Sequence, residues 1–358
     1  MKSSVIMKFL VIFAVLIISS CQEKKSRNTK QKTDINEFLG QWNIDIEGGS
    51  IGWIEIRQED GYLDADVLWG GGEIIPVPYI FLVDSVLYIG RDTRRVIRKK
   101  DSEENNSRVW YKKRVEMTFP VCLKIQKKPG KANKIVGHVL SPKENGIGVD
   151  STSFIGTRLP DVPPAPDLTG LKYGNPIVLF NGNDLRGWKS LDKKLKNPFH
   201  VVDGVLVKDP EPNVRYTELR TEQEFEDFNL KLEVNVPKGN NSGVYLRGIY
   251  EIAIEQGHAD SGGRELDACN IGGVYSRIST TVNAERPAGT WQTLDITLCD
   301  RHINVILNGT TVIDNQPVYG PTGGAISSDV FAPGPIMIQG TEAGKVLFRN
   351  IVLKPIVK

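Results

Sequence analysis

The feature that most constrains the fold of this chain is a period-two alternation of apolar and polar residues between Asn240 and Glu255. One phase is apolar and consists of Val244, Leu246, Tyr250, Ile252 and Ile254. The other phase carries Tyr245, Arg247, Glu251 and Glu255. Successive side chains of a β-strand point to opposite faces, so the pattern predicts a strand with one face in a core and one polar face. Gly248 can make a turn or shift the register, which leaves the phase across it open.

Composition favours strands throughout the chain. The 358 residues include 35 glycines and 20 prolines, and no long stretch shows helical periodicity. Many short strands joined by turns are therefore expected, in an all-β chain long enough for two domains. The net charge of +2 gives no general attraction to nucleic acid, and we expect no nucleic-acid partner.

The N-terminus has the pattern of an export signal. Lys2 and Lys8 flank the start of an apolar run, Phe9–Ile18, which is shorter than the ~20 residues needed to span a bilayer. The run ends in Ile-Ser-Ser before Cys21 and resembles the lipobox of bacterial lipoproteins. That resemblance implies lipidation of Cys21 and attachment to a membrane of the bacterial cell envelope. The alternative is an ordinary signal peptide with an incidental cysteine.

The expected domain boundaries follow from changes in composition. Residues 1–21 are the signal peptide, 22–34 a polar, basic tether, 35–160 an antiparallel β-barrel or sandwich, 161–175 a proline-rich linker, and 176–358 a second β-domain. Phe38–Trp42 and Phe154–Arg158 resemble the opening and closing motifs of lipocalins. Six basic residues between Arg91 and Lys100 are expected in a solvated loop, with an acidic glycan as an alternative partner.

The second domain is predicted to be a two-sheet sandwich of the jelly-roll type. Some ten short strands fall between residue 176 and the end of the chain, and Asn308-Gly309 is a strong hairpin signal. Trp188 is expected in the core. The three remaining cysteines and the four histidines lack metal-ligand spacing, so no zinc site, no metal ligand and no cofactor are predicted. A divalent cation fits this fold class, but no cluster in the sequence specifies one.

An ordered set of short motifs in the second half of the chain resembles the 3-keto-disaccharide hydrolase family. The motifs are Leu179–Trp188, Val202–Leu206, Asn241–Gly248, Tyr250-Glu251, Arg286–Trp291, Leu307–Gly309 and Phe348–Ile351. The resemblance implies a concanavalin A-like jelly roll in an exported protein that acts on an oligosaccharide or modified sugar. The chain departs from the family at Ala253, where relatives often carry Gln, and at Gly340–Gly344, where an Asp-His pair is absent.

The family chemistry assigns roles to several residues. A ketone at C3 of a sugar acidifies the hydrogen on C2; a base removes it, the resulting enolate expels the group at C1, and water adds later. Glu251 is expected to be the base, Arg247 the partner of the oxyanion, and Glu255 or Glu342 the acid. Gln339 is expected to orient sugar hydroxyls, with Asn241, Tyr245, Tyr250 and His258 as further substrate-binding candidates.

Two alternatives stay open at the level of sequence. Glu251 and Glu255 resemble the paired glutamates of retaining endoglucanases, whose carboxyl groups lie ~5–5.5 Å apart. Four strand residues separate the two Cα atoms by ~13 Å, which the side chains have to bridge. The other alternative is a glycan-binding lipoprotein without catalysis, because the jelly roll serves lectins as readily as hydrolases.

Overall fold

The fold is described from a computed structural model that places residues 34–98, 114–143, 145, 147–212, 214–255, 266–340 and 344–357. For residues 92–98 and 114–121 only the backbone is described. The chain divides into two units, Met1–Asp34 and Ile35–Lys358, and the account below concerns the second. Within the described residues, no helix combines the length and the apolar character that crossing a bilayer requires.

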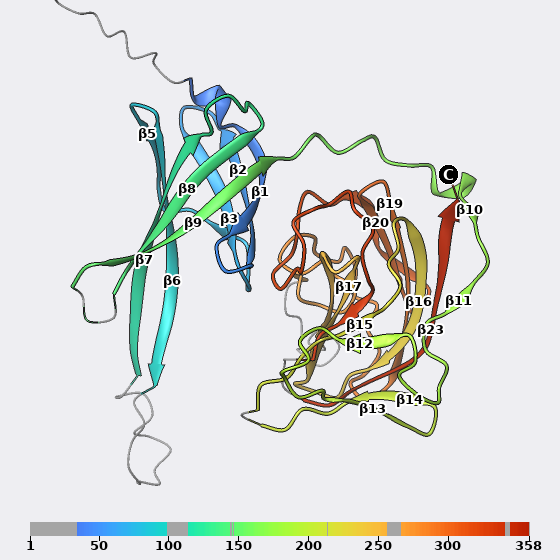
Figure 1. Ribbon diagram of the computed structural model, residues 1–358. Coiled ribbons are helices and arrows are strands. Elements are labelled where there is room, and N and C mark those ends of the chain that lie inside the picture. The colour runs from blue at the N-terminus through green and yellow to red at the C-terminus, as the bar shows by residue number, and fades with distance from the viewer. Residues whose placement is uncertain are drawn as a thin grey trace, which may run out of the picture. The chain divides into compact units, whose positions relative to one another are not determined.

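The first part of the compact unit is a single antiparallel sheet (Figure 1). A short 3-10 helix, η1 (Ile35–Glu37), precedes its nine strands. These are β1 (Gly40–Ile46), β2 (Ile51–Gln58), β3 (Leu63–Trp69), β4 (Ile75–Pro76), β5 (Ile80–Val83), β6 (Val86–Arg98), β7 (Arg114–Lys127), β8 (Lys134–Pro142) and β9 (Val149–Arg158). Their order is β4-β3-β2-β1-β9-β8-β7-β6-β5. The last strand, β9, therefore pairs with the first, β1. All other neighbouring strands of this sheet are consecutive in the chain.

This sheet curls around a core of its own. Trp42 and Ile44 of β1, Ile56 of β2 and Leu123 of β7 are fully or almost fully buried in one cluster, although β2 and β7 are not neighbours in the sheet. The expected loop between Arg91 and Lys100 is wrong for residues 91–98, which form part of β6 and pair with β7. Hydrogen bonding along this ladder outweighs the charged composition on which the loop prediction rested.

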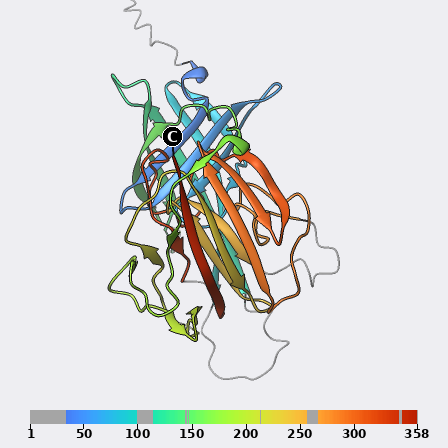
Figure 2. The ribbon, with the colours of Figure 1, turned by 90° about the vertical axis from the view of Figure 1, so that its right-hand side faces the viewer.

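The second part is a two-sheet sandwich. After η3 (Leu168–Gly170), the larger sheet has the order β13-β14-β23-β16-β19-β20-β21, with β10 and β11 also on β23. Its strands are β10 (Lys172–Tyr173), β11 (Ile177–Val178), β13 (Phe199–Val202), β14 (Val205–Lys208), β16 (Phe228–Asn235), β19 (Trp291–Cys299), β20 (His302–Leu307), β21 (Thr310–Pro317) and β23 (Val346–Val357). Figure 2 shows several of these strands side by side. The smaller sheet has the order β12-β15-β22-β17-β18, formed by β12 (Trp188–Ser190), β15 (Leu219–Thr221), β22 (Met337–Ile338), β17 (Asn241–Leu246) and β18 (Tyr250–Glu255).

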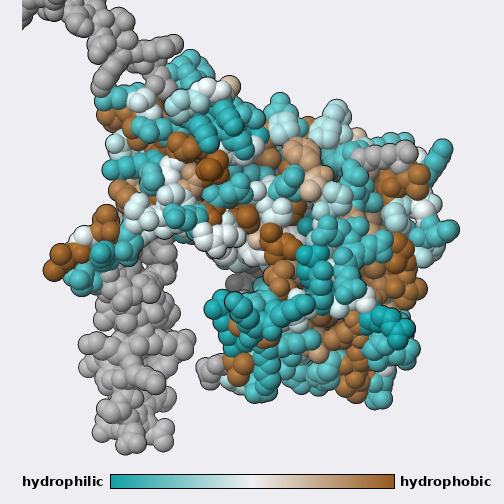
Figure 3. All heavy atoms as spheres, in the orientation of Figure 1, coloured by the Kyte–Doolittle hydropathy of each residue, from teal (hydrophilic) through white to brown (hydrophobic). Residues whose placement is uncertain are grey.

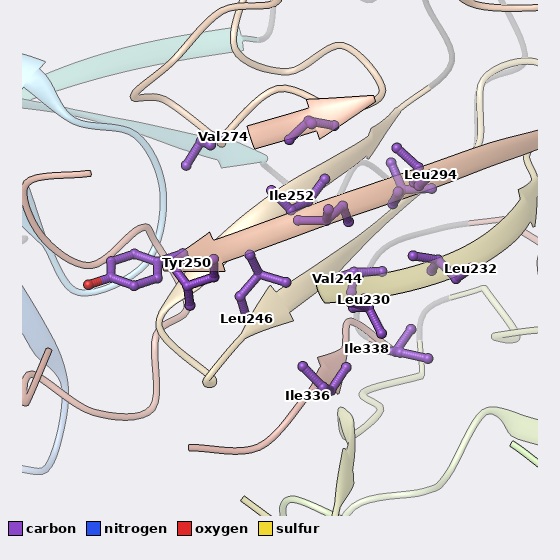
Figure 4. Close-up of a cluster of buried hydrophobic side chains, with 14 of the residues drawn as sticks. Leu230, Leu232, Val244, Leu246, Tyr250, Ile252, Val274, Leu294, Ile336 and Ile338 are labelled. Atoms are coloured by element: carbon purple, nitrogen blue, oxygen red, sulfur yellow. The ribbon is translucent and has the colours of Figure 1, made fainter. Parts of the chain in front are cut away.

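The core of the sandwich lies between these two sheets. Figure 4 shows Leu230 and Leu232 of the larger sheet gathered with Val244 and Ile338 of the smaller one. Trp188 is buried as expected, and its indole nitrogen donates to the Leu179 carbonyl at 2.6 Å. The chain is thus all-β with a jelly-roll sandwich, as predicted. Figure 3 shows hydrophilic side chains over much of the viewed surface, with hydrophobic ones between them.

Two turns explain how the sandwich strands connect. Asn308 and Gly309 have φ values of 53° and 86°, as a type I′ hairpin turn requires, and they join β20 to β21. Residues 244–255, read from the sequence as one strand, are instead the hairpin β17–β18, in which Leu246 pairs with Tyr250. Arg247, Gly248 and Ile249 form its turn, and the first two have φ values of 57° and 66°. The turn keeps Tyr245 opposite Glu251, so the predicted division into two faces survives outside the turn.

The hydrophobic cluster of the sandwich includes residues from the preceding β-domain. Trp53 of β2 and Leu68 of β3 belong to it and are 3% and 0% exposed. Ile74, which precedes β4, packs against the same cluster. The two β-domains therefore share buried apolar surface.

Candidate functional site: a carboxylate-lined pocket

A pocket of about 260 Å³ lies on the face of the smaller sheet that points away from the core. Val244, Ile252 and Ile338 turn into the core, and their neighbours Tyr245, Glu251, Ala253 and Gln339 line the pocket. The lining consists of Gly71, Gly72, Glu218, Asn241, Ser242, Tyr245, Glu251, Ala253, Glu255, Cys269, Tyr275, Gly323, Gly324 and Gln339.

The two smallest residues of strands β17 and β18 make the hollow. Gly243 and Ala253 are register partners at the centre of β17 and β18. Larger side chains surround them, with Tyr245 and Glu251 on one side and Glu255 on the other. Ala253, which departs from the family pattern, is therefore part of the pocket lining, where a longer side chain would occupy space open to a ligand.

The best-defined polar contact in the pocket joins Tyr245 and Glu251. The Tyr245 hydroxyl lies 2.8 Å from Oε2 of Glu251 and 2.9 Å from the carbonyl oxygen of Gly323. Tyr245 and Glu251 are 2% and 5% exposed. Gly243 makes room for the carboxylate, because a Cβ there would lie 2.1 Å from Oε1 of Glu251.

This arrangement links the proton of Tyr245 to the protonation of Glu251. A phenol has one hydrogen to donate, and a carbonyl oxygen can only accept. An ionised Glu251 can only accept, and Tyr245 then donates to it; when Tyr245 donates to Gly323, a protonated Glu251 can donate to Tyr245. Burial, and then the charge of Glu251, raises the pKa of Tyr245 well above its ordinary value, so the phenol keeps its proton at neutral pH.

The backbone of Glu251 is fixed on both sides of the residue. Its amide donates to Oγ1 of Thr322 at 2.9 Å, and its carbonyl accepts from the Tyr275 amide at 2.9 Å. Thr322 in turn donates its hydroxyl to the Ile249 carbonyl. The carboxylate is thus presented from a rigid strand, which is the preorganisation that a catalytic base needs.

Gln339 presents an unsatisfied polar atom at the pocket. Its backbone amide donates to the Gly243 carbonyl at 2.9 Å, and its backbone carbonyl accepts from Ser242 Oγ at 2.9 Å. Its side-chain oxygen Oε1 is buried and has no hydrogen-bond partner among the described residues. Buried acceptors of this kind are normally paired, so a ligand hydroxyl is a suitable donor.

The charge of the pocket is negative. Glu218, Glu251 and Glu255 line it, and no lysine, arginine or histidine is among the described lining residues. Burial, followed by the charges of Asp267 and Glu255, raises the pKa of the Cys269 thiol to about 11. At neutral pH the thiol is therefore protonated and is a poor nucleophile. Cys122, Cys269 and Cys299 are all free thiols.

The structure brings together five of the predicted site residues and separates two. Asn241, Tyr245, Glu251, Glu255 and Gln339 all line the pocket. Arg247 does not, because Nη2 of its buried guanidinium donates to the carbonyls of Val330 and Ala332, each at 2.6 Å. Its expected role beside an oxyanion does not fit this placement, which follows from its position in the turn.

Tyr250 is likewise a core residue rather than a pocket residue. It is fully buried, and Figure 4 shows its ring at one end of the hydrophobic cluster with the hydroxyl pointing away from the cluster. Its expected contact with substrate does not fit this position. Cys21, His258 and Glu342 lie outside the described residues.

Sequence reasoning missed several lining residues. Glu218 had a usable signal, because it directly precedes the buried Leu219 at the start of β15. Tyr275, Gly323 and Gly324 come from connections without such periodicity. Gly71 and Gly72 belong to the other β-domain, and no pattern in the sequence links them to β17 and β18.

One group of metal-ligating side chains lies away from the pocket lining. Ligand atoms of Asp227, Cys299 and Asp300 lie within 4.8 Å of one another. Internal hydrogen bonds connect them: the Asp300 amide donates to Asp227 at 3.2 Å, and Cys299 Sγ donates to Asp300 at 3.8 Å. The cluster therefore stabilises the β19–β20 turn within the described structure.

The fold is a jelly-roll sandwich whose smaller sheet carries a pocket lined by three carboxylates, and fold alone does not define function. Residues 175–354 match the family described as 3-keto-alpha-glucoside-1,2-lyase-like domains, and the chain belongs to this family. The family assignment supports a role on carbohydrates and a glycoside hydrolase-type enzyme.

Solved structures similar to this chain include two candidate glycosyl hydrolases from Parabacteroides distasonis. One is 25% identical, with 54% of this chain and 93% of that chain covered and a TM-score of 0.40. The other is 20% identical, with 50% and 92% covered and a TM-score of 0.41. A Bacillus licheniformis β-glucanase is 14% identical, with 53% and 99% covered and a TM-score of 0.31. No curated protein matches the sequence.

Proposed function

We propose that the protein cleaves the glycosidic bond of a 3-keto-glycoside, with Glu251 as the base that removes the proton from C2. The observation that carries this proposal is the buried Tyr245–Glu251 pair, which couples a carboxylate to a neutral phenol in a sugar-sized pocket. The membership of residues 175–354 in the 3-keto-alpha-glucoside-1,2-lyase-like family supports the choice of substrate.

The proposed reaction begins with proton transfer from C2 to Glu251. The electron pair of the broken C2–H bond forms the C2=C3 double bond, and the negative charge goes to the C3 oxygen. Once Glu251 carries the proton, it can donate to Tyr245 while Tyr245 turns its own hydrogen to the Gly323 carbonyl. The new proton is thus accommodated without leaving a buried group unpaired.

The second half of the reaction releases the leaving group. The enolate re-forms the C3 ketone, a C1=C2 double bond appears, and the C1–O bond breaks. The departing oxygen needs a proton, and Glu255 and Glu218 line the pocket as the acids available for it. Water then adds its hydroxyl to C1 and its hydrogen to C2, so the net reaction is hydrolysis.

The charge of the pocket favours a neutral sugar. Three carboxylates without a cation among the described lining residues would repel a uronic or sulfated ring. Sugar hydroxyls, in contrast, donate to carboxylates and to the unpaired Gln339 oxygen. The acidic-glycan alternative drawn from the basic segment 91–100 finds no support in this pocket.

Incubation with a 3-keto-glucoside and with its parent glucoside tests the proposal. The wild-type protein should release the aglycone from the 3-keto form alone. Glu251→Gln should reduce the rate by about 10²- to 10⁴-fold, the usual contribution of general acid–base catalysis. The new amide can still donate to Tyr245, so the melting temperature should hardly change.

The matched control is Glu222→Gln, which removes an exposed carboxylate close to β15 in the same sandwich. This variant should keep the wild-type rate. Cleavage of the parent glucoside in preference to the 3-keto form would contradict the proposal. Binding without turnover of either sugar would instead identify a glycan-binding module.

Conventional two-carboxylate hydrolysis is the second candidate, and the presence of both Glu251 and Glu255 in the pocket favours it. The substrate pair above separates the two mechanisms, because a conventional hydrolase has no need for the C3 ketone. Exchange of the C2 hydrogen with deuterated water during turnover is expected only for the proton-abstraction route.

We also propose that the protein is exported and anchored at the bacterial cell envelope through a lipid on Cys21. The apolar run Phe9–Ile18 and the Ile-Ser-Ser sequence before Cys21 support this location. Metabolic labelling with a fatty-acid analogue should mark the wild-type protein and not the Cys21→Ser variant. Equal labelling of both proteins would contradict the anchor.

A further inference from the structure

A glycine-rich loop of the first β-domain reaches the pocket of the second. Gly70–Gly72 follow β3, and Gly71 and Gly72 line the same pocket as Glu251. Residues 35–358 form one compact unit, so this loop is part of the same body as the sandwich.

The loop touches the segment that accepts the hydrogen bond of Tyr245. A Cβ on Gly323 would lie 2.1 Å from the carbonyl oxygen of Gly72 and 2.8 Å from its nitrogen, so the two glycine backbones are in contact. The Gly323 carbonyl is the second acceptor for Tyr245, at 2.9 Å. Gly323 therefore contacts both the loop and the Tyr245–Glu251 pair.

Two contacts beside the loop hold it against the sandwich, and a third, within the sandwich, fixes one of the partners. The Ile74 amide donates to Oγ of Ser276 at 2.8 Å. The Trp53 ring faces the guanidinium of Arg277, with 4.3 Å from its carbon to the ring centroid. Arg277 itself donates to the Pro321 carbonyl through Nε at 3.0 Å and Nη2 at 2.6 Å, close to Gly323 in the chain.

The backbone conformation at position 71 does not require a glycine. Gly70 and Gly72 have φ values of 71° and 91°, which favour glycine. Gly71 is outside that region, and a Cβ added to it would have no neighbour within 4 Å. A side chain at this position would be tolerated by the fold and would stand at the pocket, so its absence leaves room for a ligand.

We propose that the Gly70–Gly72 loop is a positioning and specificity element that forms the outer wall of the sugar site. It limits which sugar ring fits beside Glu251, and it offers the backbone amides of Gly71 and Gly72. Within the described chain these amides donate no hydrogen bond, and they supply donors that the acidic lining lacks. The inference rests on the proposed function only for the identity of the ligand as a neutral sugar.

Two substitutions of Gly71 in the full-length protein test whether the loop bounds the pocket. Gly71→Leu should fill the pocket entrance, whereas Gly71→Ala adds a methyl group and serves as the matched control. The first readout is alkylation of Cys269, which lines the pocket, by iodoacetamide at pH 9, measured by peptide mass spectrometry. Gly71→Leu should slow this reaction by about tenfold relative to Gly71→Ala, the scale of a steric mismatch in a pocket.

Cys122 in β7 gives the internal reference, because it lies in another strand and outside the pocket lining. Its labelling should be equal in all variants, and the melting temperatures should agree. Equal alkylation of Cys269 in the leucine and alanine variants would overturn the proposal. Should Gly71→Leu melt at a lower temperature, Gly71→Ser provides an intermediate size whose labelling must fall between the other two.

Kinetics give a second readout that separates this inference from the proposed function. With the 3-keto-glucoside, Gly71→Leu should raise KM by about tenfold and change kcat less. Absence of turnover by the wild-type protein would refute the proposed chemistry, while the Cys269 comparison would still decide whether the loop walls the pocket. Turnover with an unchanged KM in Gly71→Leu would refute the loop proposal alone.

Discussion

The hydroxyl of Tyr245 lies 2.8 Å from Oε2 of Glu251, on a strand pair where the two residues face each other in register. Because the same hydroxyl also lies 2.9 Å from the Gly323 carbonyl, its single hydrogen has two acceptors. The site therefore has two arrangements: Tyr245 donates to the ionised carboxyl of Glu251, or the protonated carboxyl donates to Tyr245 while Tyr245 donates to Gly323. This is the physical basis on which Glu251 can take up a proton in a buried position.

Tyr245→Phe should remove the second arrangement. Protonated Glu251 would then lose its partner, and the Gly323 carbonyl would lose its donor, at an expected cost of about 1–3 kcal/mol for an unpaired buried group. We expect the rate of 3-keto-glucoside cleavage to fall by about ten- to a hundredfold. Steady-state kinetics with Tyr62→Phe, at an exposed residue outside the pocket lining, as the control checks this, and an unchanged rate in Tyr245→Phe would contradict the proton-sharing role.

Gly243→Ala should displace the carboxylate of Glu251. The new Cβ would lie 2.1 Å from Oε1, and strain of this kind typically costs about 1–3 kcal/mol. Activity should fall by at least about tenfold, because a small displacement of a catalytic group is expensive. Ala253→Gly, at the register partner of Gly243, removes a methyl group instead and should retain activity. Equal activity of the two variants would argue against Glu251 as the base.

Trp53→Ala should loosen the glycine loop as well as destabilise the protein. The residue is 3% exposed and stacks on Arg277, so we expect a loss of about 3–5 kcal/mol in the free energy of unfolding. Cys269 should also become more reactive toward iodoacetamide. Leu123→Ala, in the core of the first β-domain, should destabilise comparably without changing Cys269. Similar Cys269 reactivity in both variants would contradict the anchoring role of Trp53.

The reactivity of Cys269 should rise steeply with pH. Only the thiolate reacts, and burial together with nearby carboxylates raises the pKa of Cys269 to about 11. The alkylation rate should therefore increase by about tenfold per pH unit from pH 7 and continue to rise through pH 10. Peptide-resolved labelling of the folded protein measures this, and a plateau between pH 8 and 9 would show that the thiol is not shielded as described.

The faces of the central hairpin were predictable because its turn keeps the alternation of the two strands in step, so even-numbered residues stay on one face and odd-numbered residues on the other. The sequence suggested one strand over residues 244–255, whereas the structure has two that pair antiparallel. Tyr245 and Glu251 remain on the pocket face because each is opposite the other in register. Only Arg247, which occupies the turn at a φ of 57°, leaves the predicted row. A pattern of period two cannot show where a strand reverses.

The rest of the site depends on contacts far apart in sequence. Glu218 and Gln339 reach the pocket through the pairing of β15 with β22 and of β22 with β17. Gly71 and Gly72 reach it through the packing of Trp53 and Leu68 against the sandwich. Local periodicity carries information about faces, but not about which strands become neighbours.

The shared burial of Trp53 and Leu68 has a consequence for how this protein can be divided. The proline-rich segment after Pro160 is the natural place to cut the chain by its sequence, yet a truncation there would strip apolar partners from the sandwich and open its pocket. Gene fusion or shuffling of the family domain alone would thus transfer the carboxylates without one wall of their site. For this chain, the compact unit to keep intact in such a transfer is the whole stretch from Ile35 onward.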